Sequence, residues 1–226
     1  MSADAEAPIR VTHTLSEAES KHLLAPFGIP FPIERHASTA AEAVEAAEAI
    51  GFPVVAKLNG PGIAHKTERG LVRLGLADTT AIEAAASDLL AAATDDDGEV
   101  TVLVAPMLKA NRELIVGLNR DPQFGLTVVL GIGGILAEAI ADVSIRLVPI
   151  DRHDAEEMIE DLATQALLGA FRGEPAVDRE SLIEVLLGLS QAGIEHPELV
   201  SADLNPVLVV DGQPVAVDAL VEVAGA

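Results

Sequence analysis

Short apolar runs alternate with helical patterns along the 226 residues of this chain, and this alternation restricts the fold more than any other feature. In the first half, Ser16 and Thr39 are suited to cap helices, and Gly28 and Gly51 are suited to end them. The predicted elements of this half are helices at 15–27, 38–50 and 79–94 and strands at 53–59 and 71–76. Such an alternation predicts an α+β fold.

The second half continues the same mixture and ends in a predicted hairpin around a DG turn. Its elements are apolar runs at 100–108, 112–120 and 126–150, helices at 154–168 and 179–193, and a hairpin at 199–223. A waist at 105–107 predicts two lobes with a cleft between them. The smaller lobe is expected at 28–105, and the larger at 1–27 plus 106–226, with the N-terminal helix packed on it.

The charge of the chain is strongly negative, with 36 Asp and Glu against 14 Lys and Arg and a formal net charge of -22. A field of this sign repels phosphate backbones, and aromatic residues for base stacking make up only 2% of the chain. We therefore expect no nucleic-acid partner. Few lysines and many carboxylates are typical of proteins from salt-loving archaea, so the charge indicates a halophilic habitat.

The chain has no cysteine, which excludes disulfides, thiolate catalysis and cysteine-ligated metal centres. The N-terminal segment MSADAEAPIR is acidic and has no apolar centre, so no signal peptide is expected. No apolar run reaches the ~18 residues that a membrane helix needs. We expect a soluble, cytoplasmic protein with no membrane partner.

Two cationic positions stand out in a chain with only four lysines. Lys57 ends a predicted buried strand, where its ammonium group is well placed to meet a phosphate or simply to reach solvent. In the following glycine-containing loop, His65 lies beside Lys66 and Arg69. That histidine is suited to carry phosphate or protons, although a solvated loop histidine is the plain alternative.

A glycine-rich turn, GIGG, follows an apolar run and includes Gly133 and Gly134. It lacks the third glycine of the G-x-G-x-x-G fingerprint and has no βαβ unit after it, so it is not a dinucleotide site. An anion-binding turn and a close-packed turn both remain. Glu138 and Asp142 follow it, and Arg146 is expected to pair with one of them.

The final hairpin carries a set of oxygen ligands. Alternation places Asp203 and Asn205 on one strand face, and the turn is expected to bring Asp218 across from them on the partner strand. Such hard ligands suit Mg²⁺, which commonly completes its shell with nucleotide phosphates. The alternative is a solvated edge in an acidic protein.

These pieces, taken in order, resemble the ATP-grasp beta subunit of ADP-forming acyl-CoA synthetases, relatives of succinyl-CoA synthetase. The resemblance covers residues 15–223 and implies a two-lobed ATP-grasp fold with the nucleotide in the cleft. It rests on LSEAESKHLLAPFGIP, VVAKL, P-x-I-x-HKT, RELIVG with DP-x-FG, GIGG-I-x-x-E-x-x-x-D, LLGAFRG-x-P, D-x-NP and VDA.

The resemblance implies roles for individual residues. Lys57 matches a lysine that contacts nucleotide phosphate, and Glu113 matches an acid that lines the nucleotide site. Asn205 and Asp218 match the Mg²⁺ ligands, with Asp203 beside them. His65 matches a histidine that takes phosphate from a phosphohistidine of the alpha subunit.

The implied reaction is acyl-CoA + ADP + phosphate giving acid + CoA + ATP, with a CoA-binding alpha subunit as partner. Ala105 stands where relatives often carry Glu or Gln, and Gly70-Leu71 replaces a double glycine, so ADP and GDP both stay open as substrates. Two other functions stay open as well. These are a stand-alone ATP-grasp carboxylate ligase and a non-catalytic nucleotide-binding subunit.

Overall fold

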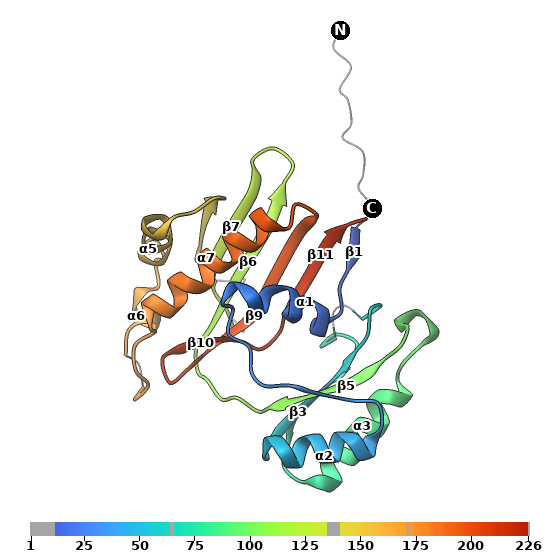
Figure 1. Cartoon of the computed structure of the whole chain (residues 1–226). Coiled ribbons are helices and arrows are strands. Elements are labelled where there is room, and N and C mark those ends of the chain that lie inside the picture. The colour runs from blue at the N-terminus through green and yellow to red at the C-terminus, as the bar shows by residue number, and fades with distance from the viewer. Residues whose placement is uncertain (1–11, 64–65, 135–140, 171, 226) are drawn as a thin grey trace.

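The computed structural model describes residues 12–63, 66–134, 141–170 and 172–225, which form two antiparallel sheets with helices packed on each (Figure 1). Within these residues the larger sheet has seven strands and the smaller sheet four. The larger sheet has the order β1 (Thr12–Thr14), β11 (Leu220–Ala224), β9 (Leu199–Val210), β6 (Glu113–Asp121), β7 (Gly125–Ile132) and β8 (Val143–Leu147), with β10 (Gln213–Ala216) also paired to β9.

Helices cover one face of the larger sheet. Helix α7 (Arg179–Glu195) packs on β6 and β7, and α1 (Glu17–Leu24) packs on β11 and α7. Helix α5 (Arg152–Glu160) packs on β8 and α7, and the short α6 (Gln165–Leu168) follows it. The alternating inward side chains of the strands meet these helices in one apolar core, which includes Leu24, Val116, Leu130, Met158 and Leu189.

The smaller sheet has the order β2 (Arg35–Ala37), β5 (Thr101–Pro106), β3 (Val54–Asn59) and β4 (Val72–Leu76). Helices α2 (Ala40–Ile50) and α3 (Thr79–Ala91) lie on the side of this sheet away from the larger one (Figure 1). Their buried faces are rich in alanine, including Ala43, Ala47 and Ala86, so both helices approach the strands closely. A second apolar core results.

We infer from these two cores that the chain divides into two lobes. The small lobe is built on β2 to β5 with α2 and α3, and its core runs from Ala37 to Val104. The large lobe is built on the seven-stranded sheet, and its core includes Leu24 of α1 and also Ile29. The N-terminal helix therefore packs on the large lobe.

The predicted helix ends agree with the structure where the cause is local. Ser16 caps α1 in a capping box with Glu19, and Gly28 has a φ of 82° after the short 3₁₀ turn Ala25–Phe27. Thr39 caps α2, and Gly51, with a φ of 96°, ends it. Glycine is favoured at both helix ends because a side chain disfavours positive φ.

Two predicted helices differ from the observed ones. The predicted helix 79–94 ends at Ala91, and a 3₁₀ turn, Asp95–Asp97, follows it. The predicted helix 154–168 is two helices, because the Asp142 carboxylate accepts the backbone N–H groups of Ala163 and Thr164 at 2.8 and 2.7 Å. None of the helices in the described ranges is both long and apolar enough to cross a bilayer.

The predicted C-terminal hairpin is also different, because the partner strand of β9 is split into β10 and β11. Pro206 has no backbone N–H to donate to this partner, whereas its carbonyl oxygen accepts the N–H of Val217 at 3.2 Å. Asp218 therefore lies in the short segment between β10 and β11, and its expected place on a strand is wrong.

Candidate functional site

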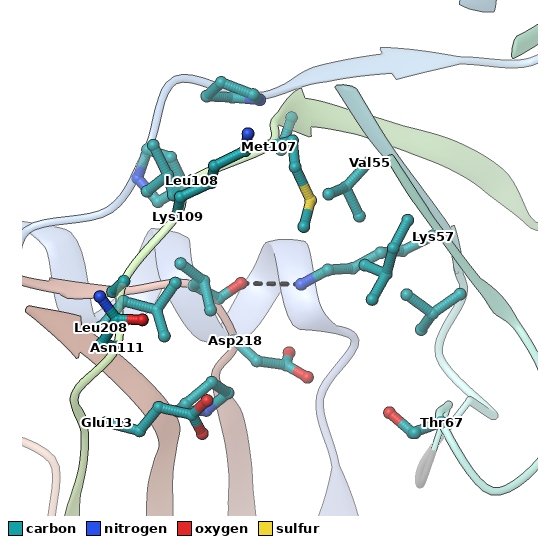
Figure 2. Close-up of a pocket in the computed structure, with 18 of the residues that line it drawn as sticks. Val55, Lys57, Thr67, Met107, Leu108, Lys109, Asn111, Glu113, Leu208 and Asp218 are labelled. Atoms are coloured by element: carbon teal, nitrogen blue, oxygen red, sulfur yellow. Dashed lines mark hydrogen bonds between the residues drawn. The ribbon is translucent and has the colours of Figure 1, made fainter. Parts of the chain in front are cut away.

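A cavity of about 790 Å³ lies between the lobes, and Figure 2 shows the side chains around it. Strands β3, β4 and β5 of the small lobe form one wall, and β6, β9 and the segment before β11 form the other. Residues 107–111, in the connection from β5 to β6, close one end. The described lining residues include Val55, Lys57, Thr67, Met107, Leu108, Lys109, Asn111, Glu113, Leu208 and Asp218.

The two ends of the cavity differ in polarity. Val55, Met107 and Leu108 lie toward one end together with Lys109, whereas Glu113 and Asp218 lie toward the other (Figure 2). The largely apolar end suits a flat organic ring, and the acidic end suits a cation or the metal-bound phosphates of a ligand. The cavity is therefore shaped for a molecule with both parts.

Lys57 is held at the inner wall by β3, whose six residues are all buried. Its Nζ donates to Glu17 Oε1 and to the Val217 carbonyl oxygen, both at 2.7 Å, and the second contact is the dashed line in Figure 2. Burial alone would lower the pKa of Lys57, but the carboxylates of Glu17 and Asp218 raise it above its usual value. The side chain is therefore a stable cation beside the cavity.

Glu17, in the first turn of α1, is the centre of a buried ion cluster. Its side chain is 0% exposed, and Oε1 accepts from Lys21 and from Lys57, each at 2.7 Å. Lys66 Nζ lies 2.9 Å from Oε2 without hydrogen-bond geometry. Although burial opposes ionisation, Lys57, Lys21 and Lys66 together hold the pKa of Glu17 well below its usual value. The carboxylate is therefore ionised.

Asp218 lies where the cluster meets the cavity, and its side chain is 31% exposed. Lys66 Nζ donates to Asp218 Oδ1 at 3.2 Å. Burial and the charge of Glu17 raise the pKa of Asp218, and partial burial together with the charge of Asp218 raises that of Asp203. A cation bound near Asp218 would stabilise the charged form of both carboxylates.

Asp218, Asp203 and Asn205 carry oxygen ligands of the kind that Mg²⁺ takes. Asp203 and Asn205 are exposed on one face of β9 and are not among the residues that line the cavity, and Leu220, two residues after Asp218, pairs with Asp203. In the described part of the chain, no three acidic or histidine side chains form a ready metal cage. Mg²⁺ commonly binds through one or two carboxylates and completes its shell with water and phosphate oxygens. These residues therefore fit an ion that a nucleotide helps to hold.

Glu113 begins β6 and lines the cavity, and the GIGG turn packs directly against it. The Gly133 N–H donates to the Glu113 carbonyl oxygen at 2.8 Å, and a Cβ at Gly133 would lie 3.1 Å from the Glu113 carbonyl carbon. Gly134 has a φ of 89°, which favours glycine. This geometry favours the close-packed turn over an anion site and makes the turn a support for Glu113.

Several sequence-based expectations differ from the structure or lie outside it. Arg69 does not present a free charge, because its guanidinium donates to both carboxylate oxygens of Asp97, at 2.7 and 2.9 Å. Arg146 pairs with Asp161 and Glu157 instead of Asp142, whose carboxylate accepts backbone N–H groups. His65 and Glu138 lie outside the described residues.

The sequence-based reasoning missed Glu17, Lys21 and Lys109. Lys21 and Glu17 lie four residues apart, a common spacing for helix ion pairs, and Lys109 lines the cavity. All four lysines of the chain therefore lie in the ion cluster or at the cavity wall. The scarcity of lysine was the signal that pointed to this place.

Comparisons with known proteins identify the family of this chain. The sequence profile of the ATP-grasp domain matches residues 7–223. The chain is 36% identical over 208 residues to the beta subunit of acetate–CoA ligase [ADP-forming] I from Pyrococcus furiosus, covering 91% of this chain and 90% of the relative. It is 38% identical to the corresponding subunit of ligase II from the same organism, with coverages of 85% and 84%.

Solved structures give the same result. A dinucleotide-forming acetyl-coenzyme A synthetase 1 from Ca. Korarchaeum cryptofilum, in complex with coenzyme A, Ca-AMPCP and HgCl⁺, matches with a TM-score of 0.85 and 35% identity over 94% of each chain. The expected resemblance, the two-lobed ATP-grasp fold and the ligase class are confirmed. This chain belongs to the ATP-grasp family and, within it, to the beta subunits of ADP-forming acetate–CoA ligases.

Proposed function

We propose that this chain is the nucleotide-binding subunit of an ADP-forming acyl-CoA synthetase and transfers phosphate between a phosphohistidine and ADP. The observation that supports this most strongly is that Lys57 and Asp218 lie on the wall of one cavity whose far end, at Val55, Met107 and Leu108, is largely apolar. A nucleoside diphosphate has the same division into a flat apolar base and charged phosphates.

Lys57 is suited to bind a phosphate in the cavity. An ammonium group has three N–H donors, and Glu17 Oε1 and the Val217 carbonyl oxygen accept two of those of Lys57. Among its contacts in the described residues, one donor is therefore left for a ligand. Phosphoryl transfer depends mainly on positioning and on charge stabilisation, and a buried cation at the cavity wall supplies both.

Asp218 and Asn205 would hold Mg²⁺, with Asp203 beside them. When bound there, the ion offsets the negative charge of the phosphate oxygens. The chain itself binds the base between Val55 and Leu208, directs Lys57 to the phosphates and keeps bulk water from the inner wall. In the direction of ATP synthesis, the P–N bond of a phosphohistidine breaks, and an oxygen of the terminal ADP phosphate forms the new P–O bond.

His65 is proposed as the phosphate carrier within this chain. This role rests on the HKT motif and on the family resemblance, because His65 lies outside the described residues. A related structure from Ca. Korarchaeum cryptofilum, 36% identical with a TM-score of 0.78, holds Mg-AMPPCP with a phosphohistidine segment that points towards the nucleotide binding site. The next residue, Lys66, is already paired with Glu17 and Asp218.

A separate alpha subunit is the proposed partner. The two Pyrococcus furiosus relatives are themselves beta subunits, and this chain spans most of each. In a longer relative from Archaeoglobus fulgidus, acetate–CoA ligase [ADP-forming] I, the chain spans 30% of the length. We propose that an alpha subunit supplies CoA binding and the first phosphohistidine.

Titration calorimetry in molar KCl tests the nucleotide assignment. We expect ADP and ATP to bind with a Kd that falls when Mg²⁺ is added, because the ion joins Asp218 to the phosphates. GDP and GTP titrated in parallel measure the base preference. An absence of heat with all four nucleotides would overturn the proposed function.

A further inference from the structure

Three buried lysines each contact both Glu17 and the segment that carries Asp218. Lys21 and Lys57 lie 2.7 Å from Glu17 Oε1, and both donate to the Val217 carbonyl oxygen, at 3.1 and 2.7 Å. Lys66 lies 2.9 Å from Glu17 Oε2 and 3.2 Å from Asp218 Oδ1. Among the described contacts, every lysine that binds the Val217–Asp218 segment therefore also contacts the Glu17 carboxylate.

The partners in this cluster come from both lobes. Glu17 belongs to α1, which packs on the large lobe through Leu24, whereas Lys57 lies on β3 of the small lobe. A further contact joins the same elements, because the Ala18 N–H donates to Asn59 Oδ1 of β3 at 3.1 Å. The first turn of α1 therefore fixes the inner wall of the small lobe against the large lobe.

We propose that Glu17 is a positioning residue for phosphoryl transfer, because its carboxylate sets the distance between Lys57, which binds phosphate, and Asp218, which binds the metal. The inference rests on the proposed function and extends it to a residue that lines no part of the cavity. Glu17 is fully enclosed, so it acts through the lysines and does not touch the nucleotide.

The physical reason is charge balance in an enclosed space. Three ammonium groups repel one another where water cannot screen them, and the Glu17 carboxylate is the anion that all three share. Without its charge, Lys57 and Lys66 separate, and the Val217–Asp218 segment loses the contacts that set its position. A nucleotide whose phosphates contact both Lys57 and a metal ion at Asp218 is then expected to bind with lower affinity.

Glu17→Gln tests the inference, and Glu34→Gln is its matched control. Glu34 is a second, partly buried carboxylate of the cluster, but among the described residues its ion pair is with Lys21 and not with Lys57 or Lys66. Calorimetry with ADP, with and without Mg²⁺, gives the Mg²⁺-dependent gain in affinity for each full-length protein. We expect Glu17→Gln to reduce this gain about tenfold, as removing a supporting residue of a metal site commonly does. Glu34→Gln should keep it.

Thermal melts show whether each variant is folded at the temperature of titration. If Glu17→Gln alone does not fold, the double variant Glu17→Gln with Lys21→Met removes one charge of each sign and so keeps the net charge of the cluster. A reduced gain is still expected from it, because Lys57 and Lys66 remain two like charges without the carboxylate that both contact. Folded variants that keep the parent's Mg²⁺-dependent gain, or an equal loss in Glu34→Gln, would overturn the inference. A parent that binds no nucleotide would instead contradict the proposed function itself, and the inference with it.

Discussion

Glu17 Oε1 and Lys57 Nζ lie 2.7 Å apart, although α1 packs on the large lobe and β3 belongs to the small one. The pair is buried, with side-chain exposures of 0% and 10%. Because Lys57 also lines the cavity, the same ion pair joins the lobes and places a cation where phosphate is expected to bind.

Acid titration should reveal the Glu17 contribution to stability. The lysines lower the pKa of Glu17 in the folded chain, so its charge stabilises the fold above the unfolded-state pKa near 4.5. This contribution falls as the pH drops from there toward the folded-state pKa. Removing one partner of a buried ion pair costs about 3–5 kcal/mol.

Melting temperatures of the parent and Glu17→Gln, measured from pH 7 to pH 3 in molar KCl, check this prediction. We expect the parent to have the higher melting temperature at pH 7. The difference between the two melting temperatures should shrink below pH 4.5, where the contribution of ionised Glu17 to the stability of the parent begins to fall. A difference that stays constant over the whole range would show that the charge of Glu17 is not its source.

Asp218→Asn should weaken Mg²⁺-dependent ADP binding about tenfold while leaving the fold intact. Burial and Glu17 raise the pKa of Asp218, so its ionised form is unfavourable in the folded chain, and the neutral amide removes that cost. Calorimetry and thermal melts on the same samples separate the two effects. The melting temperature should stay equal or rise slightly.

The control for that variant is Asp211→Asn, at the exposed turn between β9 and β10. Asp211 has a φ of 49°, a conformation that asparagine also adopts readily, so the turn is preserved. The Asp211→Asn variant should bind Mg-ADP with the same Kd as the parent. If Asp218→Asn also binds like the parent, the metal assignment is wrong.

Salt should stabilise the chain strongly. With a net charge of -22, carboxylates repel one another at low ionic strength, and a Debye length of ~3 Å in molar salt screens that repulsion. We expect the melting temperature to rise between dilute buffer and molar KCl. No rise would contradict the halophilic interpretation and leave the site unaffected.

Local features of the fold were predictable from sequence, whereas contacts between distant segments were not. Ser16, Gly28 and Thr39 set helix ends through their own conformation, so their effect is visible in the sequence. The helix break at 161–164 depends on Asp142, about 20 residues away, which takes the two N–H groups. No helical periodicity reveals such an acceptor.

The same limit applies to the site. The type and spacing of Lys57, Asn205 and Asp218 suggested phosphate and metal binding, but the contact of Glu17 with Lys57 spans 40 residues and that of Lys66 with Asp218 spans 152. Arg69 looked free because its partner, Asp97, is 28 residues away in an acidic turn. Only the packing of the two lobes decides which charges meet.

His65→Ala should separate nucleotide binding from turnover. His65 directly precedes Lys66 in the sequence, and we propose that it carries phosphate to ADP. Removing its imidazole leaves Lys57 and Asp218 in place, so Mg-ATP should bind with nearly the parent's Kd. Acyl-CoA-dependent ATP synthesis by the complex with the alpha subunit should be abolished, because the carrier nitrogen is missing.

The matched control is His153→Ala on α5. The side chain of His153 is 77% exposed, and His153 is not among the residues that line the cavity. It should support full turnover, and full turnover by His65→Ala as well would show that phosphate reaches ADP without this residue.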